Sequence, residues 1–154
     1  MLDVYKIRKD FPILGKKVNN TDLIYFDNAA TSQTPNQVID VISSYYKENN
    51  SNIHRGLHSL SADATNKYEN SRSIIKNHFG AAHDHEIIFT SGTTHGINIV
   101  SSGLEKFISS KDELIVSEME HHSNIVPWQM LCEKTGSKLK VIPINDDGTL
   151  NIDE

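Results

Sequence analysis

The sequence predicts an α/β fold with a parallel-rich sheet flanked by helices. Three short apolar runs of strand length lie in the second half of the chain and alternate with two longer segments of helical periodicity. The connections between them are short, and strand–helix–strand units of this kind build parallel sheets. The predicted strands are Glu86–Thr90, Glu113–Ser117 and Lys138–Ile142, and the predicted helices between them are Thr94–Phe107 and Asn124–Thr135.

The first half of the chain is predicted to be mostly helical. A short amphipathic helix over residues 2–13 is ended by Pro12, and Leu23–Phe26 is an apolar run that could form a strand. Two further helices have recognisable starts or ends, because proline is favoured in a first turn and glycine just after a last turn. They run from Pro35 to about Lys47 with Thr34 as N-cap, and from a cap at Ser61 to Phe79, with Gly80 ending the second.

Composition narrows the class of protein. The chain is mildly acidic, with a formal charge of −5, and contains no run of like charges. Neither nucleic acid nor a membrane surface is therefore expected as a partner. The N-terminus lacks a signal-like apolar core, and no stretch approaches the roughly 20 apolar residues of a membrane span. Cys132 is the only cysteine, which fits a reducing compartment. We therefore expect a cytoplasmic protein, with Cys132 as a buried structural residue.

A phosphate site is suggested where the first of the three strands meets its helix. The run Ser91-Gly92-Thr93-Thr94 lies at this junction, and a helix N-terminus presents unpaired N–H groups and a partial positive charge. Gly92 permits a close approach of the backbone, and the threonines add hydroxyl groups. The run has neither the spacing of a Walker A loop nor that of a dinucleotide-binding loop. On the residues alone, a simple helix cap is an equally good interpretation.

Two histidines follow the second strand. His121 and His122 would share one rim of the sheet with the Ser-Gly-Thr-Thr turn, because loops after successive parallel strands lie at the same edge. An imidazole there could stack on a flat ring or move a proton, although a surface pair beside a helix start is the simpler alternative. The histidine spacings match no HExxH motif and have no cysteine partners, so no metal site is predicted.

Two loops in the first half contain candidate ligand-binding residues. Asp27-Asn28-Ala29-Ala30 is a run of small residues that would let the backbone approach a ligand, or it is a plain loop before a helix. His54-Arg55-Gly56-Leu57-His58 puts an arginine between histidines, and a guanidinium can bind carboxylate or phosphate. A solvated loop explains the second run about as well.

Several runs, in order, resemble the SufS-type cysteine desulfurases of the class V aminotransferase family. The resemblance covers essentially the whole chain, and the run from His121 to Trp128 is its most specific part. The matching runs are Arg8–Leu14, Tyr25–Thr31, His54–Ser61, Gly92–Asn98, Glu120–Gln129 and Asp147–Thr149.

The resemblance implies a fold type I domain that binds pyridoxal 5′-phosphate. Thr93 and Thr94, with nearby backbone N–H groups including that of His95, would hold the phosphate. His95 stands at a position that is often acidic in this family. His121 would stack on the pyridine ring and help to move protons, as the one catalytic residue expected here. Five residues would lie at the substrate mouth, of which the last two could be contributed across a dimer interface: Asp27, Ala29, Ala30, His54 and Arg55.

The family reaction converts L-cysteine to L-alanine and leaves the sulfur as an enzyme persulfide, which a sulfur-acceptor protein receives for iron–sulfur cluster assembly. Family members are homodimers more than twice as long as this chain. Their cofactor-binding lysine, the aspartate that pairs with the pyridine nitrogen and their sulfur-accepting cysteine lie further along, and no lysine here has the Ser-x-His-Lys context. The chain is therefore expected to be an N-terminal portion, inactive alone.

The resemblance also implies a division of the chain. Residues 1–20 would belong to the small domain of the full family fold, and residues 21–154 to an incomplete cofactor-binding large domain. Two alternatives remain: a non-catalytic truncated half-domain, and another class V member such as a selenocysteine lyase or an isopenicillin-N-epimerase-like protein.

Overall fold

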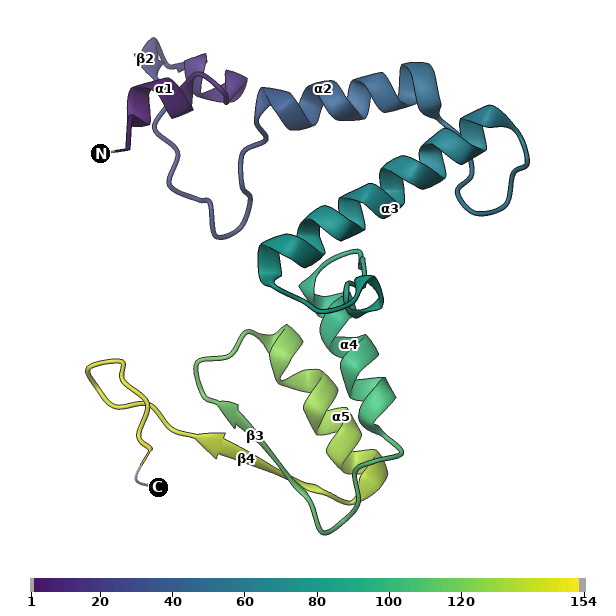
Figure 1. The fold of residues 1–154 in the computed structure, drawn as a ribbon. Helices are drawn as coiled ribbons and strands as arrows, with labels where there is room; N and C mark the ends of the chain where they lie inside the picture. Colours follow the sequence, from purple (N-terminus) through teal and green to yellow (C-terminus); the bar gives the residue numbers. More distant parts are fainter. Residues whose placement is uncertain (1, 153–154) are drawn as a thin grey trace. The chain divides into compact units, whose positions relative to one another are not determined.

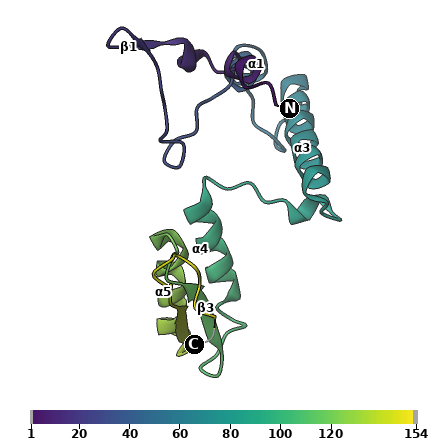
Figure 2. The same ribbon diagram turned by 90° about the vertical axis from the view of Figure 1, so that its left-hand side faces the viewer.

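A computed structural model describes residues 2–152 and shows two compact units, one ending at Ile87 and the other beginning at Ile88 (Figures 1 and 2). The division at Ile87 does not coincide with the domain boundary expected after residue 20, which refers to the full-length family fold and stays a prediction.

The first unit is mostly helical, as predicted. Its longest element is α3, which runs from Ser59 to Phe79 and ends at Gly80 in the left-handed conformation, φ 69°, that glycine adopts without strain. The other elements are α1 (Val4–Arg8), η1 (Pro12–Gly15), the antiparallel pair β1 (Lys17–Val18) and β2 (Thr21–Asp22), α2 (Asn36–Ser44), the π-helical turn η2 (Tyr45–Asn49) and η3 (Asp84–Glu86).

The second unit contains a strand–helix–strand motif. β3 (Glu113–Ser117) pairs in parallel with β4 (Lys138–Ile142), and α5 (Val126–Thr135) connects them. The helix α4 (Thr93–Leu104) packs against α5, and the 3₁₀ turn η4 (His122–Asn124) contacts both helices. Both strands have the predicted bounds, and their parallel pairing confirms the α/β interpretation of this part of the chain.

A further expectation for the second unit, the burial of Cys132, is met. Pro127 lies in the first turn of α5, where its missing N–H costs no hydrogen bond. Cys132 is 9% exposed and packs in a small core with Val116 and Leu131. A left-handed Gly136 ends α5. The core is held partly by a buried hydrogen bond, in which the Ser101 hydroxyl of α4 donates to the Pro127 carbonyl at 2.9 Å.

Two predicted strands are wrong. Residues 23–26 and 87–90 are extended or irregular, and no described residue pairs with either run in a ladder. A strand is defined by its hydrogen bonds to a neighbour, so an apolar run of strand length is not enough. Ile24 and Ile88 are 76% and 67% exposed, which shows that their apolar faces are uncovered in this structure.

Two predicted helix caps are also wrong. Pro35, not Thr34, is the N-cap of α2, and the first amide of that helix donates to the Asp10 carbonyl at 2.7 Å. His58, not Ser61, caps α3, because its Nδ1 accepts from the Ser61 N–H at 3.4 Å. Both errors have one cause: the groups that satisfy these helix starts are a distant carbonyl and a histidine, neither of which is a typical cap. The short predicted helix at residues 2–13 is replaced by α1 and η1.

No helix within residues 2–152 is both long enough and apolar enough to cross a lipid bilayer.

Candidate functional site

The start of α4 is the first part of the candidate site. Its first intrahelical hydrogen bond runs from the Gly96 N–H to the Gly92 carbonyl, 3.0 Å, so the amides of Thr93, Thr94 and His95 precede the ladder. All three residues are exposed. Gly92 has φ 140° and ψ 174°, a region essentially restricted to glycine. A Cβ built there would meet nothing within 4 Å, so the torsion and not the space requires glycine.

The His95 side chain folds back over the turn that precedes α4. Its Nδ1 accepts a hydrogen bond from the Ser91 N–H at 3.2 Å and lies 3.0 Å from the Ser91 hydroxyl. A backbone N–H can only donate, so Nδ1 is unprotonated and the neutral ring carries its proton on Nε2. The ring therefore serves as a local cap from the third position of the helix.

His121 is held by the same kind of contact. The Ser123 N–H donates to its Nδ1 at 3.1 Å, and the Ser123 hydroxyl lies 2.9 Å from the same atom. The ring is therefore fixed by one edge, with Nε2–H as its donor. His121 is exposed, and its ring lies edge-on to that of His122 with the centroids 6.2 Å apart.

A chain of polar contacts fixes the loop that carries His121. The Glu120 carboxylate accepts from the Ser117 hydroxyl at 2.8 Å and from the Asn124 amide at 2.7 Å. The Asn124 carbonyl oxygen in turn accepts from the Trp128 indole N–H at 2.9 Å. The pKa of Glu120 is lowered, first by the Asn124 amide and then by the Ser117 hydroxyl, because both donate to its ionised form. The loop is thus tied at β3, at η4 and in the first turn of α5.

The two parts lie at the same end of the second unit. The turn η4, which directly follows His121, contacts α4. Figures 1 and 2 both show the starts of α4 and α5 side by side at one end of this unit, beyond the carboxyl end of β3. Thr93, Thr94, His95 and His121 are therefore gathered at one rim, which is where open α/β sheets place their ligands.

The predicted mouth residues Asp27, Ala29 and Ala30 lie in an exposed loop of the first unit. Tyr25 closes this loop, because its hydroxyl is 3.0 Å from the Asp27 carbonyl and 2.8 Å from that of Thr31. The loop is therefore shaped by main-chain acceptors and not by the side chain of Asp27.

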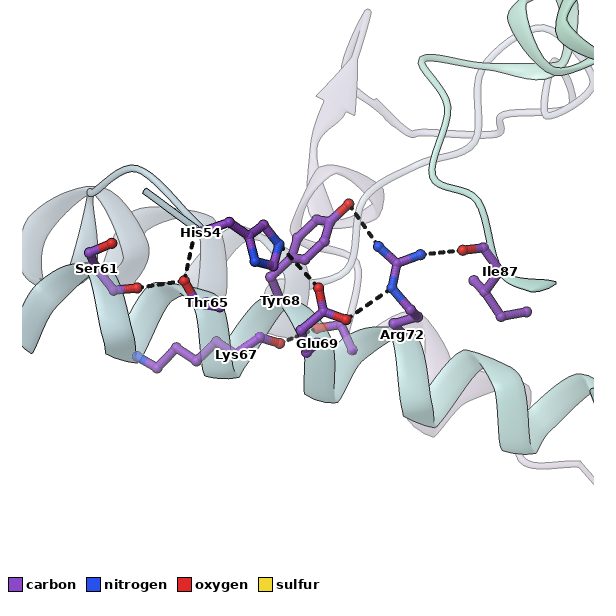
Figure 3. Close-up of polar contacts among 9 residues, drawn as sticks. His54, Ser61, Thr65, Lys67, Tyr68, Glu69, Arg72 and Ile87 are labelled. Atoms are coloured by element: carbon purple, nitrogen blue, oxygen red, sulfur yellow. Dashed lines mark hydrogen bonds and ion pairs between the residues drawn. The ribbon is translucent and has the colours of Figure 1, made fainter. Parts of the chain in front are cut away.

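His54 and Arg55 lie in a second loop of the same unit. His54 has a left-handed backbone, φ 61°, and its Nε2 lies 3.1 Å from a Glu69 carboxylate oxygen on α3 (Figure 3). Arg55 is exposed, and the structure shows no ion pair between its guanidinium and any residue from 2 to 152. Of these two residues, only His54 has a side chain held by an ion pair, with Glu69.

The sequence alone did not single out the residues that orient the histidines. Ser91, Ser123, Glu120 and Asn124 do this around the rim. Short spacings such as Ser91 to His95 and His121 to Ser123 are the signal that could have identified them, because they place a hydroxyl and a main-chain donor within reach of an imidazole.

Known proteins similar to this chain belong to one family. The aminotransferase class-V family model matches residues 24–154. A probable cysteine desulfurase of Staphylococcus epidermidis is 52% identical over 153 residues, and one of Staphylococcus aureus is 50% identical over the same length. Each alignment covers 99% of this chain and 37% of the relative, so the chain spans little more than a third of their length.

Solved structures match the fold over the same portion. An apo cysteine desulfurase from Thermococcus onnurineus superimposes with a TM-score of 0.87 at 40% identity, covering 99% of this chain and 36% of that one. The cysteine desulfurase CsdA of Escherichia coli gives a TM-score of 0.75 at 31% identity, with 95% and 36% covered. Both structures agree with a partial fold type I domain in this chain. Because the family model matches most of its residues, the chain belongs to the class-V aminotransferase family.

Proposed function

We propose that this chain supplies the phosphate-binding rim of a pyridoxal-phosphate-dependent cysteine desulfurase. The observation that carries the proposal is the start of α4, where the amides of three exposed residues follow Gly92 at the same end of the unit as the turn after His121 (Figure 1). Support also comes from the relatives, which are named cysteine desulfurases.

The residues present fit a phosphate group. A phosphate needs several converging N–H or O–H donors and a positive potential, and a helix N-terminus supplies both. Thr93 and Thr94 would add hydroxyl donors to their own amides and to that of His95. Gly92, at φ 140°, has no side chain, so the backbone directly before the helix can approach the ligand closely.

His121 fits a flat aromatic ring. Its side chain is exposed and its Nδ1 is held by the Ser123 N–H, so it would lose little side-chain freedom on binding. Its Nε2–H is the atom through which it would hold or pass a proton. When bound, pyridoxal phosphate supplies an electron sink for bonds at the amino-acid α-carbon.

The substrate and partners of the whole protein follow from the same proposal. We propose L-cysteine as the substrate, L-alanine as the product, and a sulfur-acceptor protein of iron–sulfur cluster assembly as the partner, in a cytoplasmic homodimer. Asp27, Ala29, Ala30, His54 and Arg55 are proposed at the substrate mouth. The exposed guanidinium of Arg55, which makes no ion pair with residues 2–152, is suited to a carboxylate.

Binding of pyridoxine 5′-phosphate to the chain tests the phosphate site. This analogue has no aldehyde, so it cannot react with lysines elsewhere, and unphosphorylated pyridoxine serves as the control ligand. We expect calorimetry to show binding at least about 10-fold tighter for the phosphorylated form. The double variant T93A/T94A should lose about 10-fold or more, since each hydrogen bond to a charged group is worth about 1.5–3 kcal/mol.

The matched control is T34A, because Thr34 is an exposed loop threonine for which the structure shows no side-chain hydrogen bond to residues 2–152. It should bind as the unmodified chain does. Equal affinity for the two ligands, or equal effects of T34A and T93A/T94A, would reject the phosphate site.

A further inference from the structure

The loop from Asn52 to His58 adopts a conformation that it could not hold by itself. His54 lies in the left-handed region, φ 61°, which residues other than glycine rarely enter. Such a torsion persists only where the surroundings determine it, and it is often associated with function. The contacts that hold this loop all come from one helix, α3.

Ser61 forms the first of these contacts. It is 1% exposed, and its hydroxyl donates to the Asn52 carbonyl at 2.7 Å while accepting from the Gly56 N–H at 3.0 Å. A Cβ at Gly56 would lie 2.5 Å from the Cβ of Ser61, so the loop packs directly on this side chain. Ser61 thus joins the two ends of a five-residue arc whose middle is His54.

Thr65 holds the centre of the arc. Its hydroxyl accepts from the His54 N–H at 3.0 Å and donates to the Ser61 carbonyl at 2.7 Å (Figure 3). The hydroxyl therefore both donates and accepts, and the hydrogen bond that it accepts comes from His54, the residue with the left-handed torsion. The contact therefore fixes the backbone directly before Arg55.

Glu69 holds the His54 side chain. One carboxylate oxygen lies 3.1 Å from Nε2 of His54, and the other lies 3.1 Å from Nε of Arg72. The guanidinium of Arg72 also donates to the Ile87 carbonyl and lies over the Tyr68 ring at 5.2 Å, which keeps Glu69 from turning away. Figure 3 shows the imidazole, the carboxylate and the guanidinium in a row along α3.

Ser61, Thr65 and Glu69 are spaced four residues apart and so form one stripe along α3. Together they tie the backbone N–H groups of both neighbours of Arg55, while Arg55 itself makes no ion pair with a residue between 2 and 152. We propose that Ser61, Thr65 and Glu69 are positioning residues that preform the 52–58 loop and so present the Arg55 guanidinium to a substrate carboxylate. The role of Arg55 rests on the proposed function, whereas the preformed loop does not.

Backbone ¹⁵N relaxation of the chain, without ligand, tests the positioning. In the unmodified chain the Arg55 amide should be as ordered as α3, with an order parameter near about 0.85, and T65V should lower it below about 0.6. T65S restores the hydroxyl and should restore the order. Urea unfolding of the same variants measures global stability.

A second pair of variants keeps the test independent of Thr65. E69A should disorder His54 and Arg55, whereas D63A should not, because it removes an exposed carboxylate of the same helix that makes no hydrogen bond or ion pair with residues 2–152. If the Arg55 amide stays rigid in T65V and E69A, the proposal is overturned, even where the free energy of unfolding is lower. Ser61, Thr65 and Glu69 would then only stabilise the fold. Failure of phosphate binding at α4 would instead affect the proposed function and not this result.

Discussion

The main-chain N–H of Ser123 donates to Nδ1 of His121 across 3.1 Å. This contact fixes which ring nitrogen carries the proton and how the imidazole is turned, and the matching contact from Ser91 does the same for His95 at 3.2 Å. The rim is therefore organised by main-chain donors next to each histidine in sequence.

The tautomer of His121 can be measured. Because Nδ1 accepts from a backbone N–H, we expect ¹⁵N shifts of the neutral ring to show the Nε2–H form, and S123A to keep it. S123P removes the main-chain donor and should allow a mixture of the two tautomers. A predominant Nδ1–H form in the unmodified chain would contradict the geometry.

The torsion of Gly92 predicts a stability difference. G92A should destabilise the chain by about 1–3 kcal/mol, because alanine is strained at φ 140°, ψ 174° even though space is available. G103A, in the last turn of the same helix and also with open space, should instead be stabilising by about 0.4–1 kcal/mol. Urea unfolding of the two variants measures both signs, and similar effects at both positions would refute the torsional argument.

The buried hydroxyl of Ser101 predicts a second difference. S101A removes the hydroxyl that donates to the Pro127 carbonyl between α4 and α5, which should cost about 0.5–1.5 kcal/mol. S102A, on the exposed side of α4, should have an effect within about 0.5 kcal/mol of zero. If thermal unfolding gives the same change for both variants, the hydrogen bond does not hold α4 to α5.

Glu120 should make the His121 loop sensitive to acid. Its pKa in the folded chain is below its ordinary value of 4.5, so its contribution to stability is present above pH 4.5 and is lost as the pH falls through the folded pKa. N124A removes the first cause of the shift and should move the pKa up toward the ordinary value. A ¹³C titration of the carboxyl measures this, and an unchanged pKa in N124A would contradict the assigned cause.

The isolated chain should not turn over L-cysteine. None of its lysines lies in the Ser-x-His-Lys context of the desulfurases it resembles, and the thiol of Cys132 is buried, out of reach of a substrate. With added pyridoxal phosphate and L-cysteine we expect no alanine above the control with cofactor alone. Alanine formation that needs the chain would overturn this expectation.

The parts of the fold that depend on local pattern were predictable from the sequence. The runs Glu113–Ser117 and Lys138–Ile142 became strands with the predicted bounds because each finds the other as a parallel partner. The equally apolar run at 86–90 did not, since no described strand lies beside it. Pairing is a property of two segments, and one segment cannot reveal it.

The candidate site follows the same rule. The start of α4 followed from the sequence to within one residue, although the strand at 86–90 that was expected to lead into it does not form. The Glu120–Asn124–Trp128 contacts and the His54–Glu69 pair did not follow from the sequence, because they depend on rotamers and on a left-handed backbone at His54 that no sequence pattern announces.

The central claim is that the start of α4 receives a phosphate beside His121. The most direct measurement is a ¹H–¹⁵N titration of the chain with pyridoxine 5′-phosphate. We expect the amides of Thr93, Thr94 and His95 to shift downfield in a saturable manner, together with the His121 ring signals, and pyridoxine to leave the three amides unmoved. Shifts confined to other residues, or none at these amides at saturation, would contradict the account.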